Sequence, residues 1–128
     1  MPLKILIVDD DPMMLNLYPR MLCGQDYSIT LAAGVAAATA LIRENHYDLF
    51  ITDLMLGDGL GTELTRLFAK KFPGAKSLIV SGSLTEAGDM DLSTVTECLP
   101  KPLQVDRFIA AVCRALAAPE RTTCESYA

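Results

Sequence analysis

The stretch that decides the fold is ILIVDDDP (residues 5–12), in which four apolar residues run directly into three aspartates and a proline. A short apolar run of this kind is typical of a strand that is buried in a parallel sheet. Asp11 and Pro12 suit the start of a helix, because an aspartate caps free backbone N–H groups and a proline fits the first helical turn. The stretch therefore predicts a strand, a junction rich in carboxylates and then a helix.

Three further apolar runs also end in a polar side chain. LFIT (49–52) is followed by Asp53, LIV (78–80) by Ser81, and CLP (98–100) by Lys101. In an open α/β sheet, such residues gather beyond the carboxyl ends of the parallel strands, at one edge of the sheet. We therefore expect carboxylates, a hydroxyl group and an ammonium group to meet there.

The whole chain alternates between strand and helix patterns. Strands are predicted at residues 4–8, 27–31, 49–52, 77–80 and 95–99, and helices at 12–23, 35–44, 62–72 and 103–118. Thr62 is expected to cap the third of these helices, and Val105 to face inward with Phe108 in the last. A glycine-rich loop is expected at 54–61, and a short helix at 84–90. The pattern predicts an α/β fold, a (βα)5 doubly wound five-stranded parallel sheet of flavodoxin-like type with strand order 2-1-3-4-5.

Length and composition are those of one folded domain. With 128 residues, 51% hydrophobic and 21% charged, the chain can bury a core, and we expect a domain at 1–118 and a frayed polar tail at 119–128. The net charge of −5 argues against a broad nucleic-acid surface. The chain has no apolar run of bilayer-spanning length and no C-x-x-C pair among its four cysteines, and we expect no signal peptide. We therefore expect a cytoplasmic protein without a disulfide or zinc framework.

The expected cluster of acidic groups favours a metal ion. Two carboxylates about 4 Å apart repel each other by roughly 4 kcal/mol at an effective dielectric of about 20. Lys101 alone does not neutralise Asp9, Asp10 and Asp53, whereas a hard divalent cation such as Mg²⁺ does. A carboxylate can also attack phosphorus, and a metal ion, an ammonium group and a hydroxyl group would stabilise the charge on the transferred oxygens. The cluster therefore suits phosphoryl transfer.

Four motifs together resemble those of bacterial response-regulator receiver domains, the chemotaxis-regulator-like modules of two-component systems. They are ILIVDDDP, LFITDLMLGDGLG, LIVSGS and CLPKPL, and the resemblance runs from about Leu3 to Ala118. It implies that Asp53 is the phosphoacceptor and that Ser81 and Lys101 assist the transfer. It also implies a Mg²⁺ site, in which Mn²⁺ could substitute, with ligands from Asp10, Asp53, the Met55 backbone carbonyl and, through water, Asp9.

The resemblance further implies the partners of the protein. A sensor histidine kinase or a histidine phosphotransfer protein would donate the phosphoryl group, and an unknown downstream protein would receive the signal. No direct contact with nucleic acid or membrane is expected. The domain would catalyse its own phosphorylation and dephosphorylation without turning over an external substrate, so it is not expected to be an enzyme.

The chain departs from the pattern of the family at three positions. Cys98 stands where the family usually carries Tyr or Phe, so we hypothesise that a signal travels through Ser81 and the 82–94 segment without an aromatic relay. Gly57 stands where a proline is common, which predicts a more mobile loop. Met55 lies at a position that tunes loss of the phosphoryl group, and its side chain cannot orient a water molecule, which predicts slow autodephosphorylation.

Two other functions remain open from the sequence. Asp9-x-Asp11 formally fits the D-x-D pattern of haloacid-dehalogenase-like phosphatases, which use an aspartate nucleophile and a metal ion. The chain could also be a receiver that no longer accepts phosphate and serves only as a docking module. Taken singly, each site residue also has an ordinary explanation as a helix cap, a turn residue or a surface side chain, and we assign Asp11 the role of a cap.

Overall fold

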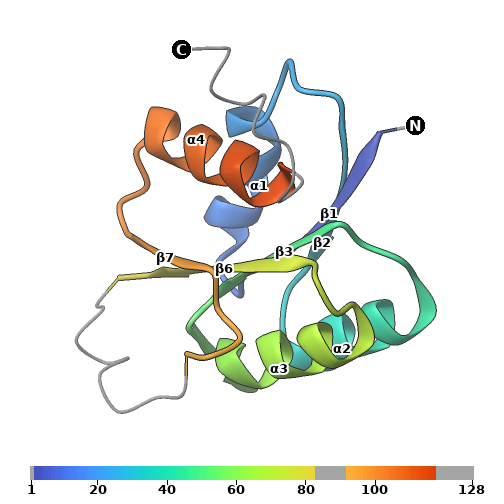
Figure 1. Cartoon of the computed structure of the whole chain (residues 1–128). Helices are drawn as coiled ribbons and strands as arrows, with labels where there is room; N and C mark the ends of the chain where they lie inside the picture. The colour runs from blue at the N-terminus through green and yellow to red at the C-terminus, as the bar shows by residue number, and fades with distance from the viewer. Residues whose placement is uncertain (1, 83–91, 118–128) are drawn as a thin grey trace.

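The computed structural model describes residues 2–82 and 92–117, which form a parallel sheet between two layers of helices (Figure 1). The sheet has the order β2-β1-β3-β6-β7, which confirms the predicted order of the five strands. Its strands are β1 (Leu3–Val8), β2 (Tyr27–Ala32), β3 (Leu49–Asp53), β6 (Lys76–Ser81) and β7 (Glu97–Pro100). The helices are α1 (Pro12–Met21), α2 (Val35–Glu44), α3 (Gly61–Lys71) and α4 (Val105–Leu116). The predicted helix at 84–90 and the tail at 119–128 lie outside the described residues.

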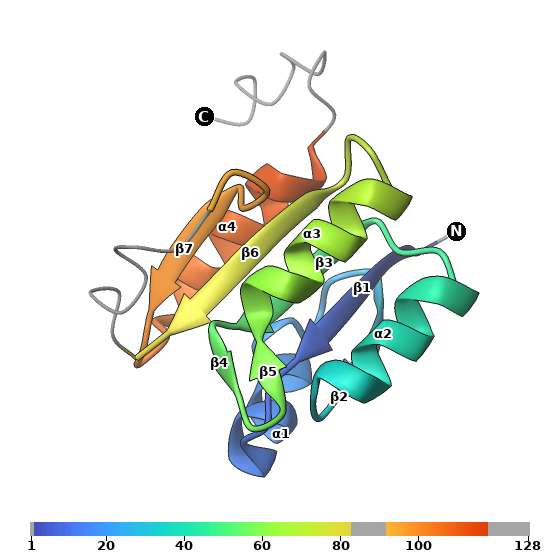
Figure 2. The same ribbon diagram turned by 90° about the horizontal axis from the view of Figure 1, so that it is seen from below.

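Helices α1 and α4 cover one face of the sheet, and α2 and α3 cover the other (Figures 1 and 2). Successive side chains of a strand point to opposite faces, so β1 contributes to two cores. Ile5 and Ile7 pack under α1 and α4, whereas Leu6 and Val8 pack under α2 and α3. Burial on both faces explains the unbroken apolar run at the start of the sequence. None of the helices in the described part of the chain is both long enough and apolar enough to cross a membrane.

The glycine-rich segment after β3 forms a small hairpin rather than an irregular loop. Strands β4 (Met55–Leu56) and β5 (Gly59–Leu60) pair antiparallel, and Figure 2 shows them at the end of the sheet toward which the arrows point. The carboxylate of Asp58 accepts hydrogen bonds from the backbone N–H groups of Val35 (2.7 Å) and Ala36 (3.1 Å), at the start of α2. The N-cap residue of α2 is Gly34, which has no side chain to make these bonds, so the hairpin supplies the cap.

The prediction that Thr62 caps α3 is wrong. Helix α3 begins at Gly61, Leu60 is its N-cap residue, and Thr62 is buried within the first turn. The carboxylate of Glu63 accepts a hydrogen bond from the backbone N–H of Leu60 at 2.9 Å. Gly61 permits this early start, because a Cβ atom there would lie only 2.1 Å from the backbone oxygen of Asp53. A glycine that allows close packing at this point looks the same in sequence as a loop glycine.

Two predictions near the end of the chain also need correction. The last strand was expected at 95–99, but Val95 lies in a turn, where its N–H bonds to the Leu92 carbonyl, and β7 starts at Glu97. Helix α4 was expected to bury Val105, which is 49% exposed, and it buries Ala111 and Ala115 beside Phe108 instead. Val105 is the first residue of the helix, so no preceding helical turn shields it. Hydrophobic periodicity identifies the inner face of a helix, but not where along its axis the contact with the sheet begins.

Candidate functional site

Three carboxylates meet at the carboxyl ends of β1 and β3. Asp9 and Asp10 follow β1, Asp53 ends β3, and one oxygen from each residue lies within 4.8 Å of the other two. Asp9 is fully buried, Asp53 is 9% exposed, and Asp10 is exposed. The parallel pairing of β1 with β3 produces this arrangement, because both strands end at the same edge of the sheet.

Lys101 supplies the positive charge at this edge. Its Nζ atom lies 2.9 Å from Asp53 Oδ2 and 3.4 Å from Asp9 Oδ2. Burial alone would lower the pKa of Lys101, but the hydrogen bond to Asp53 and the charge of Asp9 outweigh it and raise the pKa. The ammonium group therefore stays charged between two carboxylates. The bond between Lys101 and Pro102 is cis, and the backbone N–H of Lys101 donates to the Ser81 carbonyl at 2.8 Å.

Both oxygens of Asp9 are engaged by groups of the protein. Oδ1 accepts a hydrogen bond from the backbone N–H of Asp11 at 2.9 Å, and Oδ2 accepts one from the hydroxyl of Tyr18 at 3.1 Å. Burial raises the pKa of Asp9, while the Asp11 N–H and the charge of Lys101 act in the opposite direction. Asp9 is thus a fixed carboxylate, whereas in the described part of the chain no protein group bonds to the exposed carboxylate of Asp10.

The remaining predicted site residues lie at the same edge of the sheet. Ser81 is the buried last residue of β6, next to the strand that ends in Asp53. Met55 starts β4 two residues after Asp53 and is 47% exposed. Asp11 is the N-cap of α1, and its carboxylate accepts a hydrogen bond from the Met13 N–H at 3.0 Å, which confirms its predicted role as a cap.

Tyr18 is the residue of this cluster that the sequence analysis missed. It lies among the apolar residues of α1, a pattern that is typical of an ordinary core residue. A buried tyrosine hydroxyl usually finds a hydrogen-bond partner, and this rule could have drawn attention to it. Burial, and then the charge of Asp9, raises the pKa of Tyr18, so its hydroxyl keeps the proton that it donates.

Comparison with known proteins agrees with this geometry. Residues 5–113 match the family described as "Response regulator receiver domain". The chain belongs to this family, whose members are signalling modules of two-component response regulators.

Its relatives include much longer proteins. The chain is 31% identical over 117 residues to the transcriptional regulatory protein GlrR of Escherichia coli, an alignment that covers 90% of this chain and 26% of GlrR. It is 28% identical over 119 residues to the DNA-binding transcriptional regulator NtrC of a Bradyrhizobium strain, covering 91% of this chain and 25% of NtrC. The chain thus spans about a quarter of the length of these relatives.

Two solved structures show the same fold. One is a CheY-like receiver domain protein from Methanospirillum hungatei, with a TM-score of 0.83 and 28% identity over 91% of this chain and 94% of that one. The other is the response regulator TrrA from Thermotoga maritima, described in complex with Mg(2+)-BeF, with a TM-score of 0.82 and 25% identity. That alignment covers 89% of this chain and 99% of TrrA.

Proposed function

We propose that this chain is a phosphoacceptor receiver, in which Asp53 takes a phosphoryl group from a phosphohistidine on a partner protein. The observation that carries the proposal is the position of Asp53, with one oxygen 2.9 Å from the Lys101 ammonium group and two further carboxylates close by. In the transfer, a carboxylate oxygen of Asp53 attacks phosphorus and the bond from phosphorus to the imidazole nitrogen breaks. The products are an aspartyl phosphate on the receiver and a free histidine on the partner.

The acidic residues fit a divalent cation. Three carboxylates face one ammonium group, so the site has an excess of negative charge, and Mg²⁺ prefers one or two carboxylates together with other oxygen ligands. Asp10, Asp53 and the Met55 backbone carbonyl would hold the ion, with Asp9 acting through water, and Mn²⁺ would substitute. The engaged oxygens of Asp9 support this indirect role. When bound, the ion would neutralise charge on the transferred oxygens.

Lys101 and Ser81 would stabilise the phosphoryl group from the other side. The Lys101 ammonium group already contacts Asp53, so a short movement of its flexible side chain brings it to a phosphoryl oxygen. Ser81 would donate its hydroxyl hydrogen to another oxygen of that group. The domain would in this way promote its own modification and turn over no external substrate.

A protein is the better match for the phosphoryl donor than a small metabolite. A groove of about 430 Å³ runs beside the site, lined by Met14, Leu17, Met21 and Leu103 and reaching Lys101. Apolar surface at the rim of a charged site is typical of a protein contact. Because the groove and the acidic site share Lys101, a sensor kinase or phosphotransfer protein seated on α1 would present its phosphohistidine to Asp53.

The contacts favour this function over a phosphatase of the D-x-D type. A phosphatase of this type needs Asp9 as a nucleophile, but Asp9 is fully buried and both of its oxygens accept hydrogen bonds. It also needs Asp11 at the reaction centre, whereas the Asp11 carboxylate caps α1. We further propose that the domain covers residues 1–118, acts in the cytoplasm and signals by docking to a downstream protein, without direct contact with DNA.

The test is incorporation of phosphate from acetyl phosphate in the presence of MgCl2, measured by intact mass. The wild-type protein is expected to gain one phosphoryl group, and Asp53→Asn is expected to gain none. Asp26→Asn is the matched control, because it removes an exposed carboxylate away from the site and should leave incorporation unchanged. Equal incorporation in the wild type and in Asp53→Asn, or no incorporation in the wild type, would contradict the proposal.

A further inference from the structure

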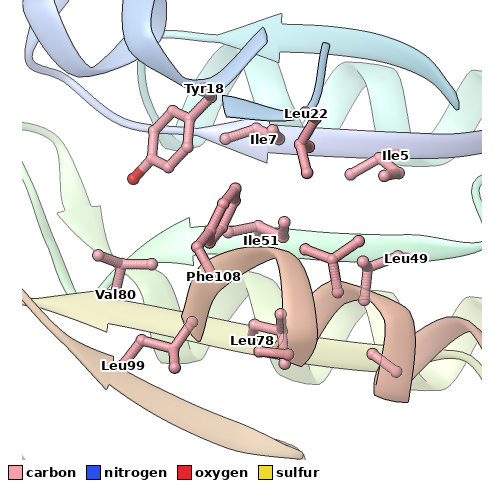
Figure 3. Close-up of a cluster of buried hydrophobic side chains, with 13 residues drawn as sticks. Ile5, Ile7, Tyr18, Leu22, Leu49, Ile51, Leu78, Val80, Leu99 and Phe108 are labelled. Atoms are coloured by element: carbon pink, nitrogen blue, oxygen red, sulfur yellow. The ribbon is translucent and has the colours of Figure 1, made fainter. Parts of the chain in front are cut away.

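A tyrosine hydroxyl is buried among the apolar side chains beneath α1 and α4. Tyr18 is fully buried, and it packs in the cluster that includes Leu22 and Phe108. Figure 3 shows its ring near Ile7 and Phe108, with the hydroxyl oxygen on the side away from Leu22. That hydroxyl donates to Asp9 Oδ2 at 3.1 Å. A tyrosine that served only to fill the core would not need its hydroxyl at this point.

The hydroxyl shares Asp9 Oδ2 with the ammonium group of Lys101. Lys101 Nζ lies 3.4 Å from this oxygen but 2.9 Å from Asp53 Oδ2, so its closer contact is with Asp53. Without the hydroxyl, Lys101 would be the remaining described side-chain donor to Asp9 Oδ2. The buried carboxylate would then turn toward Lys101, because a buried charge needs a compensating partner. That movement would change the orientation in which Asp9 faces its neighbours Asp10 and Asp53.

We propose that Tyr18 is a positioning residue of the metal site, whose hydroxyl holds Asp9 in the orientation that supports a divalent cation. The inference rests on the proposed function, because it concerns the cation that the three carboxylates would hold. Residues that bond to groups around a metal fix the geometry of the site, and their loss typically weakens metal binding by about 10- to 100-fold. Tyr18 acts through Asp9 and is not itself a ligand.

The surroundings of the ring hold the hydroxyl in place. The rings of Tyr18 and Phe108 lie 5.6 Å apart between centroids, tilted by 48°. Such an aromatic pair is favourable, and it connects α1 to α4 across the top of the sheet. A phenylalanine at position 18 would keep this packing and remove only the hydroxyl group, so the effect of the hydrogen bond can be separated from that of the core.

The experiment measures the binding of MgCl2 alone to the full chain by isothermal titration calorimetry. Tyr18→Phe is expected to bind Mg²⁺ about 10-fold more weakly than the wild type, while its circular dichroism stays unchanged. Tyr47→Phe is the matched control, because Tyr47 is also buried but precedes β3, at the other end of that strand from Asp53. Its affinity should equal that of the wild type. Unchanged or tighter binding in Tyr18→Phe would overturn the inference.

A second measurement uses the wild-type protein and so does not depend on how a variant folds. With tyrosine labelled with ¹³C at Cζ, the NMR signal of Tyr18 is expected to shift during the Mg²⁺ titration, while the signals of Tyr27 and Tyr47 stay in place. A Tyr18 signal that ignores bound Mg²⁺ would refute the positioning role and leave the proposed function standing. Absence of any Mg²⁺ binding by the wild type would instead refute the metal site of the proposed function.

Discussion

Asp10 is the acidic residue at the site whose removal should stabilise the fold without metal. Its exposed carboxylate lies within 4.8 Å of carboxylate oxygens of Asp9 and Asp53. At that separation, a pair of negative charges repels by about 3.5 kcal/mol at an effective dielectric of about 20 and by about 0.9 kcal/mol in bulk water. Because Asp10 faces solvent, the lower part of this range applies. Asp10→Asn is therefore expected to raise the free energy of unfolding by about 1–2 kcal/mol in EDTA.

Urea denaturation with and without MgCl2 is the assay for this prediction. The gain in EDTA should shrink in about 1 M NaCl, because salt screens the repulsion. In MgCl2 the order should reverse, since a ligand at about 100 times its Kd adds roughly 2.7 kcal/mol to the wild type, whereas Asp10→Asn has lost a metal ligand. Asp26→Asn removes one exposed charge just before β2 and controls for net charge.

Two results would contradict the reasoning on Asp10. Lower or equal stability of Asp10→Asn in EDTA would show that the carboxylates do not repel as their spacing requires. Equal stabilisation of the variant and the wild type by Mg²⁺ would show that Asp10 is not part of the cation site.

Four further predictions follow from individual contacts. Two backbone hydrogen bonds lower the pKa of Asp58, so its pKa in the folded protein lies below its value in the unfolded chain. The stability that Asp58 contributes is therefore present above about pH 4 and is lost as the pH falls through the folded-state pKa. Asp58→Ala should therefore be less stable than the wild type to urea at pH 7, with the difference vanishing in acid. Lys101→Met is expected to slow phosphorylation of Asp53 by acetyl phosphate about 100-fold, and a rate near that of the wild type would refute its role. Met55→Asn should shorten the lifetime of the phosphorylated protein, because an exposed amide at that position can orient a water molecule; an unchanged rate of phosphate release would count against this. Leu17→Glu should block transfer from a phosphohistidine protein but not from acetyl phosphate, and equal loss with both donors would exclude the docking role of the groove.

The order of the strands and the convergence of the charged residues were predictable from the sequence. Apolar runs define the buried strands, and parallel strands all end at the same edge of the sheet, so Asp9, Asp53 and Lys101 were expected to meet there. Helix α2 was predicted with its observed bounds, because its periodicity has a clear start and end. The residues that meet at the candidate site could therefore be predicted without any knowledge of side-chain contacts.

The features that the sequence did not reveal depend on contacts between distant segments. Asp58 caps a helix that starts 23 residues earlier, and Tyr18 bonds to Asp9 across the junction between β1 and α1. In sequence, Asp58 is a turn residue and Tyr18 is part of an apolar stripe. Local propensity describes the preferences of a residue, but it does not identify the partner that tertiary packing brings to it.

These tertiary contacts explain how the fold keeps a repulsive cluster of carboxylates in place. Asp9 is fixed by a backbone N–H and by the hydroxyl of Tyr18, and the hairpin after Asp53 is tied to α2 through Asp58. Gly61 lets α3 start against the backbone of Asp53, which fixes that strand end from below. Asp10 is left exposed, and Asp53 contacts the ammonium group of Lys101. The groups that hold the backbone and Asp9 in place are therefore largely distinct from the groups that would bind metal and phosphate. Asp10, Asp53 and Lys101 can therefore change their contacts when metal or phosphate binds, while the surrounding hydrogen bonds and packing stay constant.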